Sequence, residues 1–102
     1  MVTRDDLIAF AQKEHSGLRD LPELLMRQFF EKYYATTIVD AEGDKLYGFA
    51  VYQQWPDQAH FLCVASIRKP VLPWLREIVT KMNQKITWFD EDKMRLVTIC
   101  PS

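Results

Sequence analysis

The side chains that could carry chemistry in this chain are two histidines, two cysteines and one short acidic run. His60 lies three residues before Cys63, and an imidazole beside a thiol can generate a thiolate nucleophile. Both residues fall in an apolar run that predicts a strand, and residues three apart on a strand point to opposite faces. A cysteine–histidine pair therefore requires a bulge between the two residues, and a regular strand excludes it.

The same residues do not have the spacing of metal ligands. His15 and His60 are far apart and have no ligand partners at zinc spacing, and neither do Cys63 and Cys100. The run at residues 90–92 (Asp-Glu-Asp) lies in a predicted turn, where consecutive carboxylates rarely converge on one cation. The sequence predicts no metal site, two boundary histidines, a solvated turn and two reduced thiols in a cytoplasmic protein.

Composition limits the function classes further. The chain has 102 residues, a length typical of one domain spanning residues 1–102, and 48% of them are hydrophobic. The net charge of −1 argues against general attraction to nucleic acid or anionic lipid. Trp55, Trp74 and Trp88 are spread over three elements, which does not suit a base-stacking platform. No apolar run approaches the roughly 18 residues of a membrane span, and the first residues do not resemble a signal peptide.

Two amphipathic helices are expected first. Thr3 and Asp6 form an acidic variant of the capping box before a helix over residues 4–15. Asp20 is expected to cap a second helix that runs to about Tyr34. The apolar side of this second helix spans nearly half its circumference: Leu21, Leu25, Met26, Phe29, Phe30 and Tyr33. A face that wide is usually covered on two sides, by a sheet and by another helix or a second subunit.

The remainder of the chain predicts a sheet interrupted by one helix. The expected strands cover residues 36–40, 46–53, 60–67, 86–89 and 94–100, and residues 71–82 carry a regular helical stripe. The order is therefore ααβββαββ. We expect an α+β fold with a mixed, mostly antiparallel sheet of about five strands and three helices, the first two on one side and the third on the other. The central strand should cover residues 60–66, and the third helix should return the chain to a parallel neighbour.

The expected core draws on every element: Ile8, Leu25, Phe29, Ile38, Phe49, Val51, Leu62, Val64, Leu75, Ile78, Val79 and Ile86.

This order resembles the GNAT-type N-acetyltransferase superfamily, and especially its small, divergent bacteriophage members. The resemblance is carried by the hairpin of residues 36–52, with Gly48 in Leu-Tyr-Gly-Phe-Ala-Val-Tyr, and by residues 61–82 as the family's fourth strand and third helix. It covers about residues 3–89. The resemblance implies an acyl-coenzyme A site at the loop after the central strand, with Val64 beside the pantetheine arm. Ile67, Arg68 and Lys69 would then lie at the pyrophosphate.

The loop itself departs from the family pattern. Residues 66–73 contain no glycine that would let the backbone approach a phosphate, and Pro70 and Pro73 remove two N–H donors. Arg68 and Lys69 supply charge in compensation. No residue presents itself as a general base.

Two function hypotheses follow. The first is a non-catalytic interaction protein on a GNAT-like fold that needs no cofactor and binds a protein partner or a second copy of itself. The alternative is an acetyl-coenzyme A-binding acetyltransferase with an unspecified acceptor. For the first hypothesis the expected interface is the face of the second helix that carries Met26, Phe29, Phe30 and Tyr33, with Phe30 at its edge facing a partner.

Overall fold

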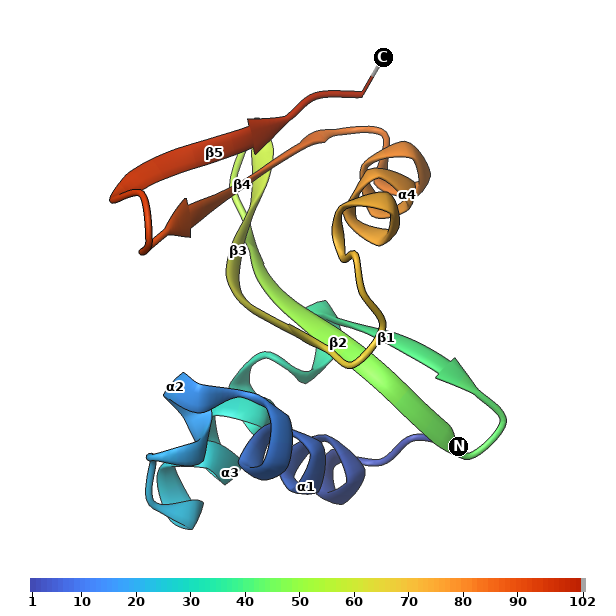
Figure 1. The fold of residues 1–102 in the computed structure, drawn as a ribbon, viewed down its shortest axis with the longest axis vertical. Helices are drawn as coiled ribbons and strands as arrows, with labels where there is room; N and C mark the ends of the chain where they lie inside the picture. Colours follow the sequence, from blue (N-terminus) through green and yellow to red (C-terminus); the bar gives the residue numbers. More distant parts are fainter. Residues whose placement is uncertain (102) are drawn as a thin grey trace.

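The computed structural model describes residues 1–101 and shows four α-helices and five strands (Figure 1). The helices are α1 (Arg4–Glu14), α2 (Ser16–Arg19), α3 (Glu23–Lys32) and α4 (Leu72–Met82), and a 3-10 turn (Tyr34–Thr36) follows α3. The strands are β1 (Thr37–Glu42), β2 (Lys45–Gln54), β3 (Gln58–Ser66), β4 (Lys85–Asp90) and β5 (Arg95–Ile99).

The strands form one sheet in the order β1-β2-β3-β4-β5. Neighbouring strands are antiparallel except β3 and β4, which are parallel and joined through α4. The predicted α+β class, the mostly antiparallel five-stranded sheet, the central position of residues 60–66 and the parallel crossover are therefore confirmed.

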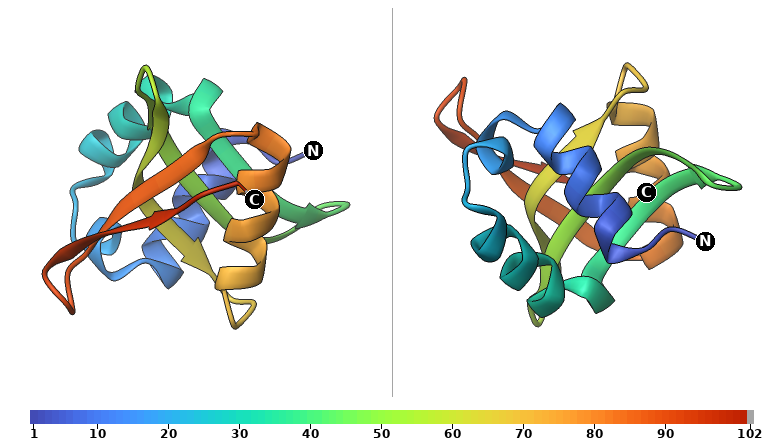
Figure 2. Two further views of the ribbon diagram at one scale, coloured as in Figure 1. Left: turned by 90° about the horizontal axis from the view of Figure 1, so that it is seen from above. Right: turned by 90° about the horizontal axis from the view of Figure 1, so that it is seen from below.

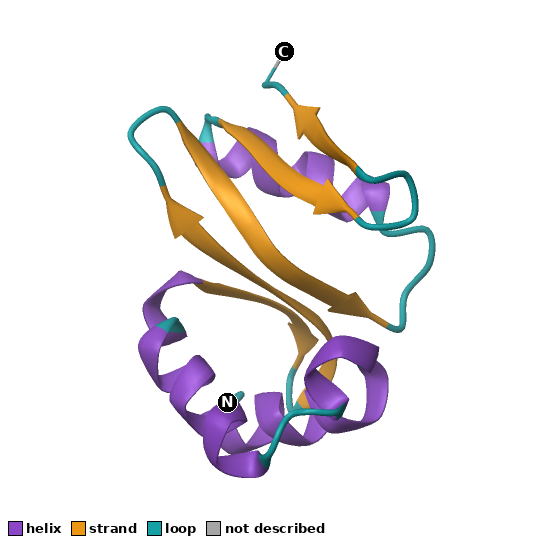
Figure 3. Cartoon of the chain, turned by 90° about the vertical axis from the view of Figure 1, so that its left-hand side faces the viewer, coloured by secondary structure: helices purple, strands orange, loops and turns teal. Residues whose placement is uncertain are grey.

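The helices cover opposite faces of the sheet. Helices α1 to α3 lie on one face and α4 lies on the other, as expected (Figures 2 and 3). Each face has its own core, because alternate residues of β2 point to opposite sides. Phe49 and Val51 join the α1–α3 side, whereas Ala50 joins the α4 side.

The N-terminal helices differ from expectation in one detail. The expected cap of the second helix, Asp20, instead ends the additional short helix α2, and α3 begins after Pro22 with no side-chain cap. His15 caps α2, because its Nδ1 accepts the N–H of Leu18. A histidine is not among the usual capping residues, so the sequence did not indicate a helix here.

A β-bulge interrupts the pairing of β2 and β3. Val51 pairs with Cys63 and the next residue, Tyr52, pairs with Phe61, so Leu62 is the extra residue. The bulge resets the alternation of β3: Phe61 packs in the core under α4, and Cys63 packs against the core under α1–α3. Leu62 is left 39% exposed, so its assignment to the core is wrong.

Helix α3 buries part of the predicted apolar side, with Met26 and Phe30 at its centre in place of Leu25 and Phe29. Met26 and Phe30, four residues apart, are fully buried against α1 and the sheet, and the Phe30 ring lies 5.3 Å from that of Phe49. Leu25 is turned about 100° away from Met26 and is 48% exposed, so its core assignment is wrong.

This orientation also corrects the expected interface. Met26 and Phe30 belong to the chain's own core and offer no surface to a partner. Phe29 and Tyr33 are partly buried and pack against the same core. Of the other core predictions, Ile38 and Val64 are also half-buried, and the rest are buried: Ile8, Phe49, Val51, Leu75, Ile78, Val79 and Ile86.

Candidate functional site

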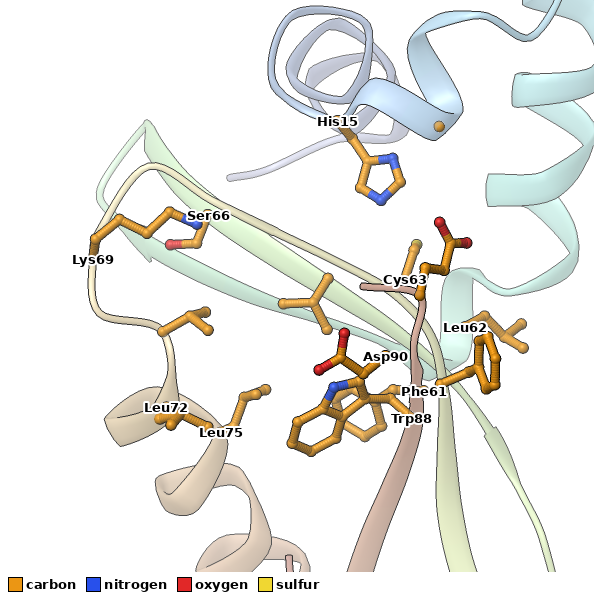
Figure 4. A pocket seen from close by; sticks show the side chains of 15 residues that line it. His15, Phe61, Leu62, Cys63, Ser66, Lys69, Leu72, Leu75, Trp88 and Asp90 are labelled. Carbon is orange, nitrogen blue, oxygen red and sulfur yellow. The ribbon is translucent and has the colours of Figure 1, made fainter. Parts of the chain in front are cut away.

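A hollow of the described chain lies where β3 and β4 part. Their parallel pairing runs from Gln58 with Lys85 to Phe61 with Trp88 and stops there. Strand β3 continues to Ser66 and β4 continues to Asp90, and a cavity of about 470 Å³ opens between them (Figure 4). We call this cavity the wedge.

The wedge has an apolar floor and a polar rim. The floor is formed by side chains of β3, α4 and β4, among them Phe61, Val64, Leu75 and Trp88. The rim carries groups of both charges and neutral hydrogen-bonding groups: His15, Ser66, Lys69, Asp90 and Glu91. Figure 4 shows the Asp90 carboxylate close to the Trp88 ring, with Lys69 on the opposite side of the hollow.

One wall of the wedge is an open strand edge. The N–H of Ile67 donates to the carbonyl of Tyr47 at 2.9 Å, in register with the pairing of β2 and β3. Antiparallel pairs alternate between bonded and unbonded, so Ala65 and Cys63 bond to β2. The backbone groups of Val64 and Ser66 then point away from β2 into the wedge. Within the described residues, no strand pairs with them on that side.

His15 presents a donor to the wedge. Its Nδ1 accepts the Leu18 N–H at 3.0 Å, so the neutral ring carries its proton on Nε2. Burial lowers the pKa of His15 from its ordinary value of 6.5, which keeps the ring neutral at pH 7. The Nε2 atom is then a hydrogen-bond donor with no free lone pair, which makes it unsuited to act as a general base.

His60 and Cys63 do share a face, because the bulge at Leu62 intervenes. His60 is nevertheless occupied elsewhere: its Nδ1 lies 2.9 Å from the Thr87 hydroxyl and its ring stacks on Trp55 at a centroid distance of 4.5 Å. Burial raises the pKa of the Cys63 thiol to about 12, which is the opposite of what a nucleophilic thiolate needs. The arrangement does not activate Cys63.

The two thiols should therefore react at very different rates. Cys100 is exposed, whereas Cys63 is largely covered and protonated at neutral pH. With Ellman's reagent at pH 8 we expect one thiol per chain to react at once and the second only after unfolding. In the Cys100→Ser variant the fast reaction should disappear, and a fast reaction that persists would show that Cys63 is activated.

The raised pKa of Cys63 also affects the stability of the fold at high pH. In the unfolded chain the Cys63 thiol ionises at its ordinary pKa of 9.0, well before it does in the folded chain. The free energy of unfolding therefore includes a contribution from keeping this thiol protonated. That contribution is complete below about pH 9 and is lost as the pH rises toward 12.

In the loop after β3, Arg68 is paired with acidic residues and is not free to bind a pyrophosphate as expected. The Arg68 guanidinium lies 2.9 Å from the carboxylate of Glu42, 3.7 Å from that of Asp40 and 3.6 Å from the centre of the Tyr47 ring. The side-chain hydrogen bond to Glu42 is the main cause that raises the pKa of Arg68. The side chain is thus bound to the β1–β2 hairpin and does not line the wedge.

Two of the four residues predicted to contact a cofactor line the wedge. Val64 and Lys69 do, and Ile67 and Arg68 do not. At the start of α4 the capping residue Val71 makes no side-chain hydrogen bond, and Pro73 lacks an N–H. The helix terminus therefore offers few donors to a phosphate.

Sequence reasoning did not place the acidic turn at this site. The Asp90 carboxylate accepts the N–H groups of Asp92 and Lys93, as expected of a turn, yet Asp90 and Glu91 also line the wedge. Their position at the wedge depends on where β4 stops pairing with β3, for which the sequence carries no local signal. Among residues 1–101 no group of three or more potential ligands could hold a metal ion, and no helix is long and apolar enough to cross a membrane.

Comparison with protein-family models, with curated proteins and with solved structures gave no match to this chain.

Proposed function

We propose that this chain is a non-catalytic interaction protein whose wedge binds an extended segment of a partner protein. The observation that carries the proposal is the open edge of β3, where the backbone groups of Val64 and Ser66 face a cavity of about 470 Å³. An extended peptide can satisfy such groups by adding a strand, and pockets along the edge then accept its alternate side chains.

The lining of the wedge suits a peptide. Val64 and Trp88, which are partly buried, offer apolar surface to a side chain, while Lys69 and Asp90 offer one charge of each sign to its polar groups. The volume lies within the range of about 300–1,000 Å³ typical of ligand sites. The Nε2 of His15 has no free lone pair for a general base and the Cys63 thiol is not activated, which favours binding over chemistry. The proposal assumes the cytoplasm, where both thiols stay reduced.

Acetyl-coenzyme A binding on a GNAT-like fold, similar to that of small bacteriophage proteins, is the second candidate. The observation in its favour is the splay of two parallel strands directly before a helix, with Val64 at the position expected beside a pantetheine arm. The structure offers little charge to a pyrophosphate. Arg68 is bound by Glu42 and Asp40, which leaves Lys69 as the one cation among the described residues that line the wedge.

A proline substitution at the open edge tests the first candidate. The Val64 N–H points into the wedge, so Val64→Pro should remove one donor for an added strand and leave the pairing with β2 intact. Twelve-residue peptides selected from a displayed random library on the wild-type chain should bind Val64→Pro at least about tenfold more weakly by calorimetry, the equivalent of about 1.4 kcal/mol.

Two controls make the result interpretable. Ala65→Pro removes an N–H that bonds to β2 and should unfold the sheet, which verifies the assignment of the two edges. Acetyl-coenzyme A is titrated in parallel, and a rise in melting temperature with that ligand would favour the acetyltransferase. Peptides that bind Val64→Pro and wild type equally would contradict strand addition in the wedge.

A further inference from the structure

The two outer edges of the sheet are built differently. Strand β1 has a register shift between Asp40 and Ala41, and its two carboxylates, Asp40 and Glu42, are engaged by Arg68. Bulges and charged residues are the usual devices that stop an edge strand from pairing with another chain. Strand β1 is therefore a protected edge.

Strand β5 has none of these devices within Arg95–Ile99. All five residues pair with β4 in an unbroken register, and the strand contains no proline and one charged residue, Arg95 at its start. Figures 1 and 3 show β5 at the rim of the sheet, with no described element beyond it. Its outer N–H and C=O groups are thus available as a template for another strand.

The surface beside this edge is apolar. Leu96 is 65% exposed and pairs directly with Phe89 of β4, which is 48% exposed, and Met94 in the preceding turn is 74% exposed. Trp88 packs in the core under α4, so the next residue Phe89 and its partner Leu96 lie on the face that α1–α3 cover elsewhere. The β4–β5 hairpin projects past those helices (Figure 2). Open backbone and exposed apolar side chains therefore coincide on one element.

We propose that β5 pairs with β5 of a second copy of this chain, antiparallel about a two-fold axis at Val97. This register pairs all five residues of each strand: Val97 faces Val97, Leu96 faces Thr98, and Arg95 faces Ile99 of the other copy. It places no charge opposite a like charge, whereas a register centred on Arg95 would oppose two guanidinium groups.

A second copy fits this edge better than an unrelated strand. The strand is β-branched or apolar from Leu96 to Ile99, so its sequence complements itself in the antiparallel direction. Two-fold pairing also closes the assembly, because each copy covers the open edge of the other and leaves the protected β1 edges outside. A pairing of five residues per chain is small, so we expect the dimer to dissociate on dilution.

Charges introduced on β5 test the proposed register, because the register decides which residues face each other across the two-fold axis. In the variant Leu96→Lys/Thr98→Lys, each introduced lysine faces another across the axis, and the chain should be monomeric. In Leu96→Lys/Thr98→Glu the same two positions carry opposite charges, and the dimer should persist. Both positions are exposed, so both variants should fold, which circular dichroism verifies. Masses are measured by light scattering at about 5 to 500 µM chain, a range suited to a weak interface.

The wild type should approach twice the mass of one chain at the highest concentration. Val39→Lys is the matched control, because Val39 is 42% exposed on the protected β1 edge, and its mass should equal that of the wild type. A wild type that stays monomeric throughout, or two double variants of equal mass, would overturn the proposal. Loss of the dimer in Val39→Lys would overturn it as well, since the interface would then lie at β1.

Discussion

Replacing Phe30 by alanine is expected to lower the free energy of unfolding by about 3–5 kcal/mol, the usual cost of truncating a buried phenylalanine. The Phe30 ring is fully buried and makes edge-to-face contacts with Phe29 at 5.4 Å and Phe49 at 5.3 Å. Its removal leaves a cavity between α3 and the sheet that neither element can close alone. Urea denaturation followed by circular dichroism measures the loss.

The exposed residue Leu24 on the same helix provides the control. It is 67% exposed, and Leu24→Ala should change the free energy of unfolding by less than about 0.5 kcal/mol. If Phe30→Ala costs under about 1 kcal/mol but alters the mass of the particle in solution, the side chain faces a partner after all, and the helix face first expected as the interface would regain support.

The second large effect is expected at Gly48, in the middle of the sheet. A Cβ added there would lie 2.6 Å from the carbonyl oxygen of Ala65 and 3.0 Å from the Cα of Ser66. Both are backbone atoms of β3, so no side-chain rotation can relieve the contact and the two strands must move apart. Gly48→Ala should therefore destabilise the chain by about 1–3 kcal/mol, the range for overpacked interiors.

A substitution at Gly43 is the control, because it removes a glycine without creating such a contact. Gly43 lies in the β1–β2 turn with φ of +58°, and a Cβ added there would have no atom within 4 Å apart from those of this residue and its two chain neighbours. Asparagine tolerates that conformation, so Gly43→Asn should cost clearly less than Gly48→Ala. Thermal melts of the two variants measure the difference, and equal losses would mean that the close approach of β2 and β3 does not matter.

Most of the fold could be predicted because it is encoded by short-range patterns. The stripe over residues 71–82 gave α4 within one residue, and the continuous apolar run at residues 60–67 gave the central strand. Gly43 between two strand-like runs gave the hairpin. In each case the signal lies within one element and is strong enough that tertiary packing does not override it.

The site could not be predicted in the same way, because it depends on relations between elements. The wedge exists because β3 and β4 stop pairing after Phe61. The residues of either strand taken alone do not indicate where the hydrogen bonding between the two strands ends. Arg68 looked like a free cation because Asp40 and Glu42, which bind it, lie 28 and 26 residues earlier in the chain. The extra residue at Leu62 is likewise a property of the pair β2–β3 rather than of either sequence.

The division of the core by the sheet has a consequence for biosynthesis. All buried members of the core under α1–α3 come from residues 7–65, whereas the core under α4 also needs Leu75, Ile78, Val79 and Ile86. A ribosome, which makes the chain from its N-terminus, has therefore synthesised every buried side chain of the first core before it adds α4. The other face of β2 and β3 stays uncovered until α4 has been synthesised. On that face Ala50, Ala59 and Phe61 are exposed to solvent until then.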